Sequence, residues 1–238
     1  MKGVFTAAIS SSRSKIHPQQ TLCRHSKGSA VGCFITFEGT EGCGKSVQTK
    51  LLSKFLKSNG YKVFVTREPG NTNIGLAIRK LLLDPKNKSL DIITELFLYL
   101  ADRAQHVKEV IEPYLKKGYI VLCDRFMDAT TAYQGYGRKL PLGLIHSLNK
   151  LATRGIKPCL TLLLDVPVKL GLQRAKRVGP EGGDRMERQA LKFHMDVYKG
   201  YHALAKKEPK RFKIVKVNRS IKEIHEEIKK IVLKKLTA

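Results

Sequence analysis

The chain has 238 residues, 42% of them hydrophobic, and its 45 Lys and Arg against 20 Asp and Glu give a formal net charge of +25. This size fits one globular domain, and no apolar run approaches the roughly 18 residues of a membrane span, which excludes a membrane-spanning class. The basic residues are spread along the chain and form no single block, which favours an anionic substrate over a nucleic-acid partner.

Residues 1–32 form a separate region. They contain no Asp or Glu, carry five Lys and Arg, and are rich in Ser. Two interpretations stay open: a mitochondrial or plastid transit peptide, or a disordered tail (or misassigned start) ahead of a domain at 33–238. We expect a cytoplasmic protein unless this segment is a transit peptide.

The next segment carries the strongest motif. An apolar run at 33–37 is followed by G-x-x-x-x-G-K-S at 39–46 and then by an apolar helical face that ends at Asn59 and Gly60. Strand, glycine-rich loop and helix in this order are typical of a P-loop, whose backbone N–H groups bind phosphate oxygens. Lys45 would reach the β- and γ-phosphates of ATP, and the Ser46 hydroxyl would bind Mg²⁺. The predicted ATP-binding residues are Gly39, Thr40, Glu41, Gly42, Cys43, Gly44, Lys45 and Ser46.

The rest of the chain alternates predicted strands and helices, which indicates a parallel sheet covered by helices on both faces. The predicted strands are 33–37, 61–66, 119–123, 160–164 and 212–217. After the P-loop helix, helices are predicted at 74–83, 90–115 (broken near Pro113), 142–154, 168–177, 184–207 and from 221 onward on the face of Ile221, Ile224, Ile228 and Ile231. The predicted fold is therefore a three-layer α/β P-loop NTPase fold, with a basic lid segment around the glycine-rich residues 179–183.

Arginines follow the predicted strands or flank the lid, where phosphates are expected. They are Arg67, Arg79, Arg125, Arg174, Arg177 and Arg185. A planar guanidinium holds phosphate oxygens in pairs, and phosphoryl transfer needs mainly positioning and positive charge. The pattern predicts a P-loop for the donor and an arginine set for an acceptor phosphate.

Several short blocks resemble thymidylate kinases of the bacterial type. They are T-R-E-P-G at 66–70, I-R-K-L-L-L at 78–83, A-D-R at 101–103, D-R-F at 124–126, A-Y-Q-G-Y-G-R at 132–138 and D-R-M-E at 184–187, and with the P-loop they follow the family's order over about 33–236. The resemblance implies transfer of the ATP γ-phosphoryl to dTMP, with Mg²⁺, by a homodimer. Two alternatives remain: a kinase for another nucleoside monophosphate, and a nucleic-acid-associated P-loop protein indicated only by the charge.

The resemblance also implies roles for the acceptor side. Arg79 and Arg125 would clamp the acceptor phosphate, and Glu68 would help to place the acceptor and its metal. Asp124 would orient Arg125 or a metal-bound water. Glu41 would either contact the acceptor sugar or metal, or brace the loop.

For the base and sugar, the resemblance implies a pocket of five side chains. Tyr99 stands where the family has a phenylalanine that stacks on thymine, which is a mild departure. Arg103, Thr130 and Gln134 match positions that hydrogen-bond the base, and Tyr133 matches a tyrosine that packs on the sugar. Ala129, which replaces a frequent serine, is a second departure.

The catalytic arginine is expected outside the P-loop. Some family members carry an arginine inside this loop, but position 42 is glycine here. The resemblance implies that Arg174, Arg177 or Arg185, which flank the lid, covers the transferring phosphoryl instead.

Overall fold

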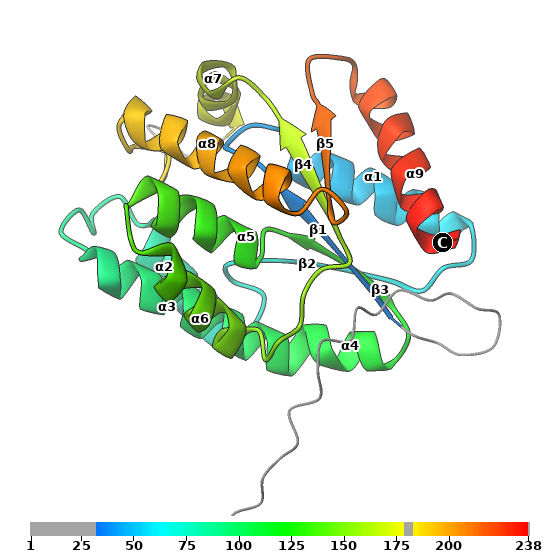
Figure 1. The fold of residues 1–238 in the computed structure, drawn as a ribbon, viewed down its shortest axis with the longest axis horizontal. Helices are drawn as coiled ribbons and strands as arrows, with labels where there is room; N and C mark the ends of the chain where they lie inside the picture. Colours follow the sequence, from blue (N-terminus) through cyan, green and yellow to red (C-terminus); the bar gives the residue numbers. More distant parts are fainter. Residues whose placement is uncertain (1–31, 179–182, 238) are drawn as a thin grey trace, which may run out of the picture.

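The computed structural model describes residues 32–178 and 183–237. A parallel sheet of five strands in the order β2-β3-β1-β4-β5 forms the central layer (Figure 1). The strands are β1 (Cys33–Glu38), β2 (Val63–Arg67), β3 (Ile120–Asp124), β4 (Leu160–Asp165) and β5 (Phe212–Lys216). The predicted α/β fold and all five predicted strands are confirmed.

Helices cover both faces of this sheet. They are α1 (Lys45–Ser58), α2 (Asn73–Leu83), α3 (Ile92–His106), α4 (Glu112–Lys116), α5 (Met127–Thr130), α6 (Leu142–Ala152), α7 (Val168–Val178), α8 (Leu191–Lys207) and α9 (Ile221–Thr237), with π-helical segments η1 (Val107–Ile111) and η2 (Thr131–Gly137). Helices α1 and α9 pack on one face, and α4, α5 and α8 lie on the other (Figure 1). In the described part of the chain, no helix has the length and apolarity needed to span a bilayer.

The core follows from the alternation of side chains along each strand. On β1, Ile35 packs in a cluster with Leu52 of α1 and Ile228 of α9, whereas Phe34 packs in a second cluster with Ile111. Successive side chains of a strand point to opposite faces, and both faces are covered by helices. A strand buried on both faces therefore reads as a continuous apolar run.

Several details differ from the sequence-based expectations, beginning with two helix boundaries. The predicted helix 184–207 begins only at Leu191, because the Asp184 side chain accepts from the backbone N–H groups of Met186 and Glu187 at 2.8 and 2.9 Å and closes a turn. Asp commonly stabilises turns in this way. The break predicted near Pro113 lies instead in the π-helical segment before it, and Pro113 occupies the first turn of α4, where a missing N–H costs little.

On α9, the predicted face is confirmed at Ile224 and Ile228 and in part at Ile231, which packs half-buried against the same core cluster, but it is wrong at Ile221. The fully buried residues of α9 are Ile224, Ile228, Val232 and Leu236, whereas Ile221 is 58% exposed. The four-residue spacing keeps one stripe of α9 against the core.

The segment after β3 carries helices that the sequence pattern did not predict. Here α5 and η2 run against α8, and a Cβ on Gly200 of α8 would lie 2.8 Å from the Tyr136 side chain. The missing side chain lets the two segments approach closely, and this places Thr130, Tyr133 and Gln134 beside the P-loop edge.

Candidate active site

The P-loop joins β1 to α1 and forms a closed cradle. Gly39, Gly42 and Gly44 have positive φ values of 139°, 64° and 90°, which L side chains rarely adopt. The buried Lys45 ammonium lies within this cradle, where it donates to the carbonyls of Gly39 at 3.1 Å and Thr40 at 3.0 Å. A fixed positive charge thus lies among backbone groups suited to phosphate oxygens.

Helix α7 packs directly on the P-loop through two glycines. A Cβ on Gly42 would lie 2.0 Å from the Gly171 carbonyl oxygen, and a Cβ on Gly171 would lie 2.4 Å from the Glu41 carbonyl oxygen. No side chain fits at either position. An arginine at position 42 is therefore excluded sterically, and any catalytic arginine must come from another segment.

The two predicted metal residues lie in contact. The Ser46 hydroxyl donates to Asp124 Oδ2 at 2.9 Å, where β3 ends beside β1. A hydroxyl and a carboxylate are the oxygen donors that Mg²⁺ prefers, and Mg²⁺ commonly takes its other ligands from substrate phosphates and water. Residues 32–178 and 183–237 hold no cluster of three or more His, Cys, Asp or Glu in metal-binding geometry.

Arg125 follows β3 and connects the P-loop to the acceptor side. Its backbone is left-handed, with φ of 69°, a conformation that costs free energy in a non-glycine residue. Its Nη1 donates to Gly39 O at 3.0 Å and to Tyr201 Oη at 3.2 Å, and its guanidinium lies 4.8 Å from the centre of the Tyr133 ring. The fold holds this cation at the border between the two expected nucleotide sites.

Two buried glutamates flank Arg125, and their pKa values are shifted in opposite directions. Burial and a neighbouring carboxylate raise the pKa of Glu38 to about 8. Burial by itself would raise the pKa of Glu41. The hydrogen bonds and charges of His194, Arg125 and Tyr133 outweigh burial and lower this pKa to about 2. Glu41 is therefore ionised, and it borders both Arg125 and Tyr133.

A pocket of about 40 Å³ brings together most of the predicted acceptor residues. Of the seven side chains expected to bind dTMP, six line this pocket, and Arg79 does not. The lining residues are Glu68, Pro69, Tyr99, Arg103, Arg125, Ala129, Thr130, Tyr133 and Gln134.

Most of the N–H donors of Arg103 already make hydrogen bonds within the protein. It is 1% exposed, and it donates to Glu68 at 2.8 Å, Thr130 at 2.7 Å, Asn149 at 2.9 Å and the Phe126 carbonyl at 3.0 Å. Few donors remain for a base. Arg103 therefore fixes the pocket wall as well as lining it.

Two side chains of α3, Arg103 and His106, contact Glu68. Its Oε2 accepts from Arg103, and its Oε1 lies 2.9 Å from His106 Nδ1. The next backbone segment is tied to the same helix, because Gly70 N–H donates to Asp102 Oδ1 at 2.9 Å. Burial, followed by the charge of Glu68, raises the pKa of Asp102 to about 6.

Arg79 lies in a cluster of positive charge near this loop. It donates to the Pro69 carbonyl at 2.9 Å. Its pKa is lowered first by burial and next by Arg67, with a further contribution from Arg125. Guanidinium groups that disfavour one another's charge form a site for an anion.

The three lid arginines lie in different surroundings. Arg174 is half-buried and Arg177 exposed on α7, which packs on the P-loop. Arg185 is 5% exposed, donates to the Leu82 carbonyl at 2.7 Å and pairs with Glu95 at 2.7 Å. Residues 179–182 of the expected lid lie outside the described residues.

Sequence reasoning missed four residues that contact this site. They are Glu38, Glu95, His194 and Tyr201. The Tyr201 hydroxyl donates to Glu38 at 2.8 Å, and His194 Nδ1 lies 3.3 Å from Glu41 Oε2. Glu38 could have been found as an acid at the end of a buried strand, but nothing in the α8 pattern marks His194 or Tyr201.

Comparisons with known proteins agree with this geometry. A sequence model of the family described as thymidylate kinase matches residues 37–228. A thymidylate kinase from Geotalea uraniireducens is 50% identical over 210 residues (87% of this chain, 99% of that protein), and one from Halothermothrix orenii is 50% identical over 198 residues (83% and 94%). The crystal structure of thymidylate kinase from Ehrlichia chaffeensis matches with a TM-score of 0.69 at 33% identity, over 84% of this chain and 98% of that one. The similarity thus spans the sheet, the P-loop and the pocket.

Proposed function

Because this chain belongs to the thymidylate kinase family and phosphorylates dTMP to dTDP with ATP, we propose roles for its individual residues in that reaction. The observation that carries the assignment is the pocket beside the P-loop, where six of the expected dTMP-binding side chains converge and Arg125 reaches toward both sites.

The donor side consists of the P-loop and the end of β3. The backbone N–H groups of residues 39–46 and the Lys45 ammonium bind the β- and γ-phosphates. Ser46 and Asp124 hold Mg²⁺, which when bound neutralises charge on these phosphates. Their 2.9 Å contact supports a shared position at the metal.

The acceptor side orients dTMP toward that phosphate. Arg125 and Arg79 bind its phosphate, and Glu68, held by Arg103 and His106, helps to place the acceptor and its metal. Tyr133, held by a hydrogen bond to Glu41, packs on the deoxyribose and disfavours a ribose 2′-hydroxyl. The base lies against Tyr99, Arg103, Thr130 and Gln134.

A lid arginine stabilises the charge that develops on the transferring phosphoryl. Arg185 is tied to Leu82 and Glu95, whereas Arg174 lies on the helix that packs against the P-loop. We assign the contact to Arg174 first and to Arg177 second, with Arg185 holding the segment after the lid. An arginine in this role contributes roughly 10³-fold or more in rate, so single alanine variants compared by kcat would rank the three.

A thermal-shift experiment tests the assignment against the nucleic-acid alternative. A ligand of the native state at about 100 times its Kd stabilises the protein by about 2.7 kcal/mol. We expect dTMP to raise Tm and dCMP to raise it far less at equal concentration. A single-stranded oligonucleotide that raises Tm at physiological salt, with no effect of dTMP, would contradict the proposal.

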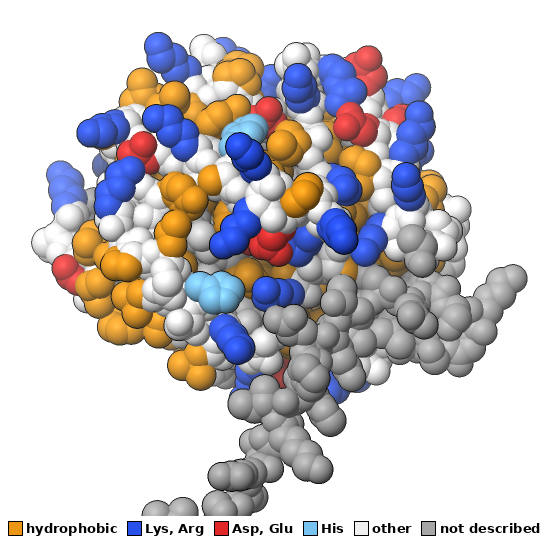
Figure 2. All heavy atoms as spheres, in the orientation of Figure 1, with side chains coloured by type: hydrophobic (Ala, Val, Ile, Leu, Met, Phe, Trp, Pro, Cys, Tyr) orange, Lys and Arg blue, Asp and Glu red, His pale blue; other side chains and the backbone are white. Residues whose placement is uncertain are grey.

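We also propose that the chain is a homodimer. Support comes from exposed apolar side chains on α3 and α6: Ile93 is 38% exposed, Phe97 55%, Leu144 44% and Leu151 76%. Figure 2 shows hydrophobic side chains gathered at the lower left, over the region of α2 and α3 in Figure 1. Light scattering after size exclusion should give twice the monomer mass, and Phe97→Asp should shift it toward the monomer. A monomeric wild-type chain would refute the proposal.

The catalytic domain is proposed to be 33–238, with residues 1–32 dispensable for chemistry. The family match, which begins at residue 37, supports this boundary. Deletion of 1–32 should leave kcat and KM unchanged, and a large loss of either would contradict it. Fusion of 1–32 to a fluorescent protein would separate organellar targeting from the cytoplasmic expectation.

A further inference from the structure

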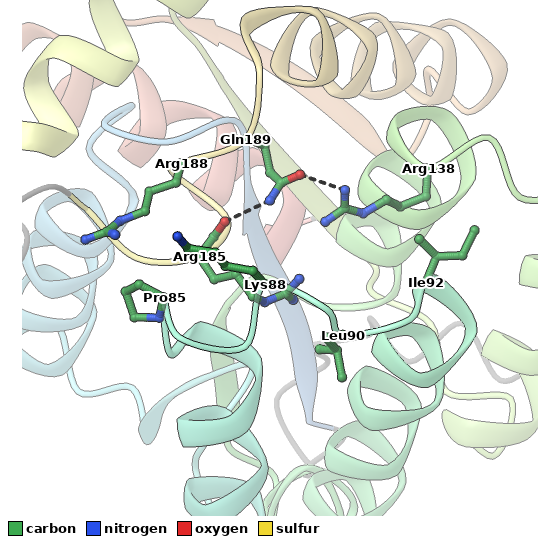
Figure 3. A pocket seen from close by; sticks show the side chains of 8 residues that line it. All are labelled: Pro85, Lys88, Leu90, Ile92, Arg138, Arg185, Arg188 and Gln189. Carbon is green, nitrogen blue, oxygen red and sulfur yellow. Dashed lines mark hydrogen bonds between the residues drawn. The ribbon is translucent and has the colours of Figure 1, made fainter.

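A buried carboxylate, Glu95 of α3, lies between the acceptor pocket and an outer cavity. It is 0% exposed. On one side it contacts Gln134, which lines the acceptor pocket. On the other side lie Arg138 and Arg185, which line a cavity of about 250 Å³ together with Gln189. Figure 3 shows Gln189 bridging these two arginines, donating to the Arg185 carbonyl and accepting from Arg138.

Both oxygens of Glu95 are occupied by donors. Oε1 accepts from Gln134 Nε2 at 2.9 Å and from Arg138 Nε at 3.1 Å. Oε2 accepts from Arg138 Nη2 at 2.9 Å and lies 2.7 Å from Arg185 Nη1. Burial acts to raise the pKa of Glu95, but the bonds from Arg138, Gln134 and Arg185 outweigh it and lower the pKa. The carboxyl is therefore ionised at neutral pH.

An ionised carboxylate fixes which end of the Gln134 amide faces it. A carboxylate only accepts hydrogen bonds, and an amide carries donors on nitrogen and an acceptor on oxygen. The two ends of a glutamine amide are assigned from their partners, and here the partner permits only the NH₂ end. Gln134 must then present its oxygen to the other side, and this oxygen accepts no hydrogen bond from the described residues.

Pyrimidine bases differ at the atom that such an acceptor would meet. Thymine carries a donor N3–H between two carbonyl oxygens, whereas N3 of cytosine is itself an acceptor. A fixed oxygen pairs with thymine and faces a lone pair in cytosine. A site built around one hydrogen bond rejects an analogue that cannot make it far more strongly than shape alone does.

We propose that Glu95 is a positioning residue for base selection: it locks the Gln134 amide so that its oxygen accepts from N3–H of the base and disfavours cytosine. This rests on the proposed contact between Gln134 and the base. Arg138 and Arg185 hold Glu95 ionised and in place for this role.

The test is Glu95→Gln, whose amide can donate as well as accept and so lets Gln134 adopt either orientation. The ratio of kcat/KM for dTMP over dCMP should fall at least about tenfold. The ratio for dTMP over dUMP should not change, because uracil shares N3–H. Lys139→Gln is the control: it removes the neighbouring positive charge, which pairs with Asp196 at 2.8 Å and lies outside the Glu95 cluster, so it should retain the dTMP over dCMP ratio.

Gln134→Ala separates failure of this inference from failure of the proposed function. If Gln134→Ala leaves the dTMP over dCMP ratio unchanged, the base contact itself is wrong. If it lowers the ratio and Glu95→Gln does not, Glu95 does not position Gln134 and the inference is overturned. In the Gln134→Ala background, Glu95→Gln should change the ratio no further.

A second measurement keeps the inference testable if the Glu95→Gln variant does not fold. With ¹⁵N3-labelled dTMP bound to the wild-type enzyme, the N3 imino proton should be protected from exchange, and Gln134→Ala should remove the protection. An imino proton that exchanges freely with water in the wild type would overturn the orientation assigned to Gln134.

Discussion

Replacing Arg125 by alanine should disable phosphoryl transfer to dTMP while leaving ATP binding nearly intact. The guanidinium lies over the Tyr133 ring and lines the acceptor pocket, and it also donates to Gly39 O of the P-loop at 3.0 Å and to Tyr201 Oη at 3.2 Å. It therefore lies where the acceptor phosphate would meet the P-loop. Alanine adopts φ of 69° at about the same backbone cost as arginine, since both carry a Cβ. The substitution therefore removes the charge without relieving backbone strain.

The size of the loss follows from the bonds that the side chain would make to the acceptor phosphate. A hydrogen bond to a charged group contributes about 1.5–3 kcal/mol, and a bidentate arginine makes two. The sum, about 3–6 kcal/mol, corresponds to a fall in kcat/KM for dTMP of roughly 10²–10⁴-fold at 1.36 kcal/mol per decade.

The assay is coupled ADP release at saturating ATP, with KM for ATP measured separately. Arg154→Ala is a matched control, because Arg154 is also left-handed (φ 53°) but lies 54% exposed beside Glu112, outside the site. We expect its kinetics to match the wild type. Normal dTMP turnover by Arg125→Ala, or a tenfold rise in KM for ATP with an unchanged KM for dTMP, would refute the acceptor role.

Three further predictions concern the loop, a buried acid and the metal. Gly42→Ala should destabilise the fold by about 2 kcal/mol or more and weaken ATP binding, because its Cβ would lie 2.0 Å from Gly171 O. Gly143→Ala is the control, because a Cβ there meets open space, and it should change neither property. Equal Tm values for the two variants would contradict the packing argument. Burial raises the pKa of Glu38 from 4.5 to about 8, so between these pH values the folded protein keeps a proton that the unfolded chain releases. The protonated Glu38 therefore stabilises the fold fully below pH 4.5, and this contribution is lost as pH rises to about 8. Glu38→Gln should flatten the decline of the free energy of unfolding between those pH values, measured by urea titration, and a decline as steep as that of the wild type would contradict the assignment. Asp124→Asn should raise the Mg²⁺ concentration needed for half-maximal rate about tenfold or more, since a carboxylate ligand is lost; an unchanged Mg²⁺ dependence would remove Asp124 from the metal site.

The fold could be predicted because its signals are local. The central strands β1, β3 and β4 are buried apolar runs, and the edge strands β2 and β5 mix apolar with exposed polar residues. The P-loop is a contiguous motif between a strand and a helix. The start of α8 was predicted wrongly because the Asp184 turn interrupts a sequence whose residue types suit a helix. The segment of α5 and η2 carries glycines and no clean period, so its path depends on packing against α8.

The site could be predicted only as far as motifs mark it. Family blocks identified six side chains that do converge in one pocket. The residues that hold them in place join distant parts of the chain, as Tyr201 does with Glu38 and Gln134 with Glu95. Such pairs follow from the tertiary fold, and no spacing along the chain announces them.

The most direct test of the account is the rate of ADP release with ATP, Mg²⁺ and each nucleoside monophosphate in turn. The pocket described here predicts the highest kcat/KM for dTMP, with dUMP next and dCMP far below. Preference for another monophosphate would retain the P-loop chemistry but contradict the base pocket, and no turnover of any monophosphate would contradict the assignment as a whole.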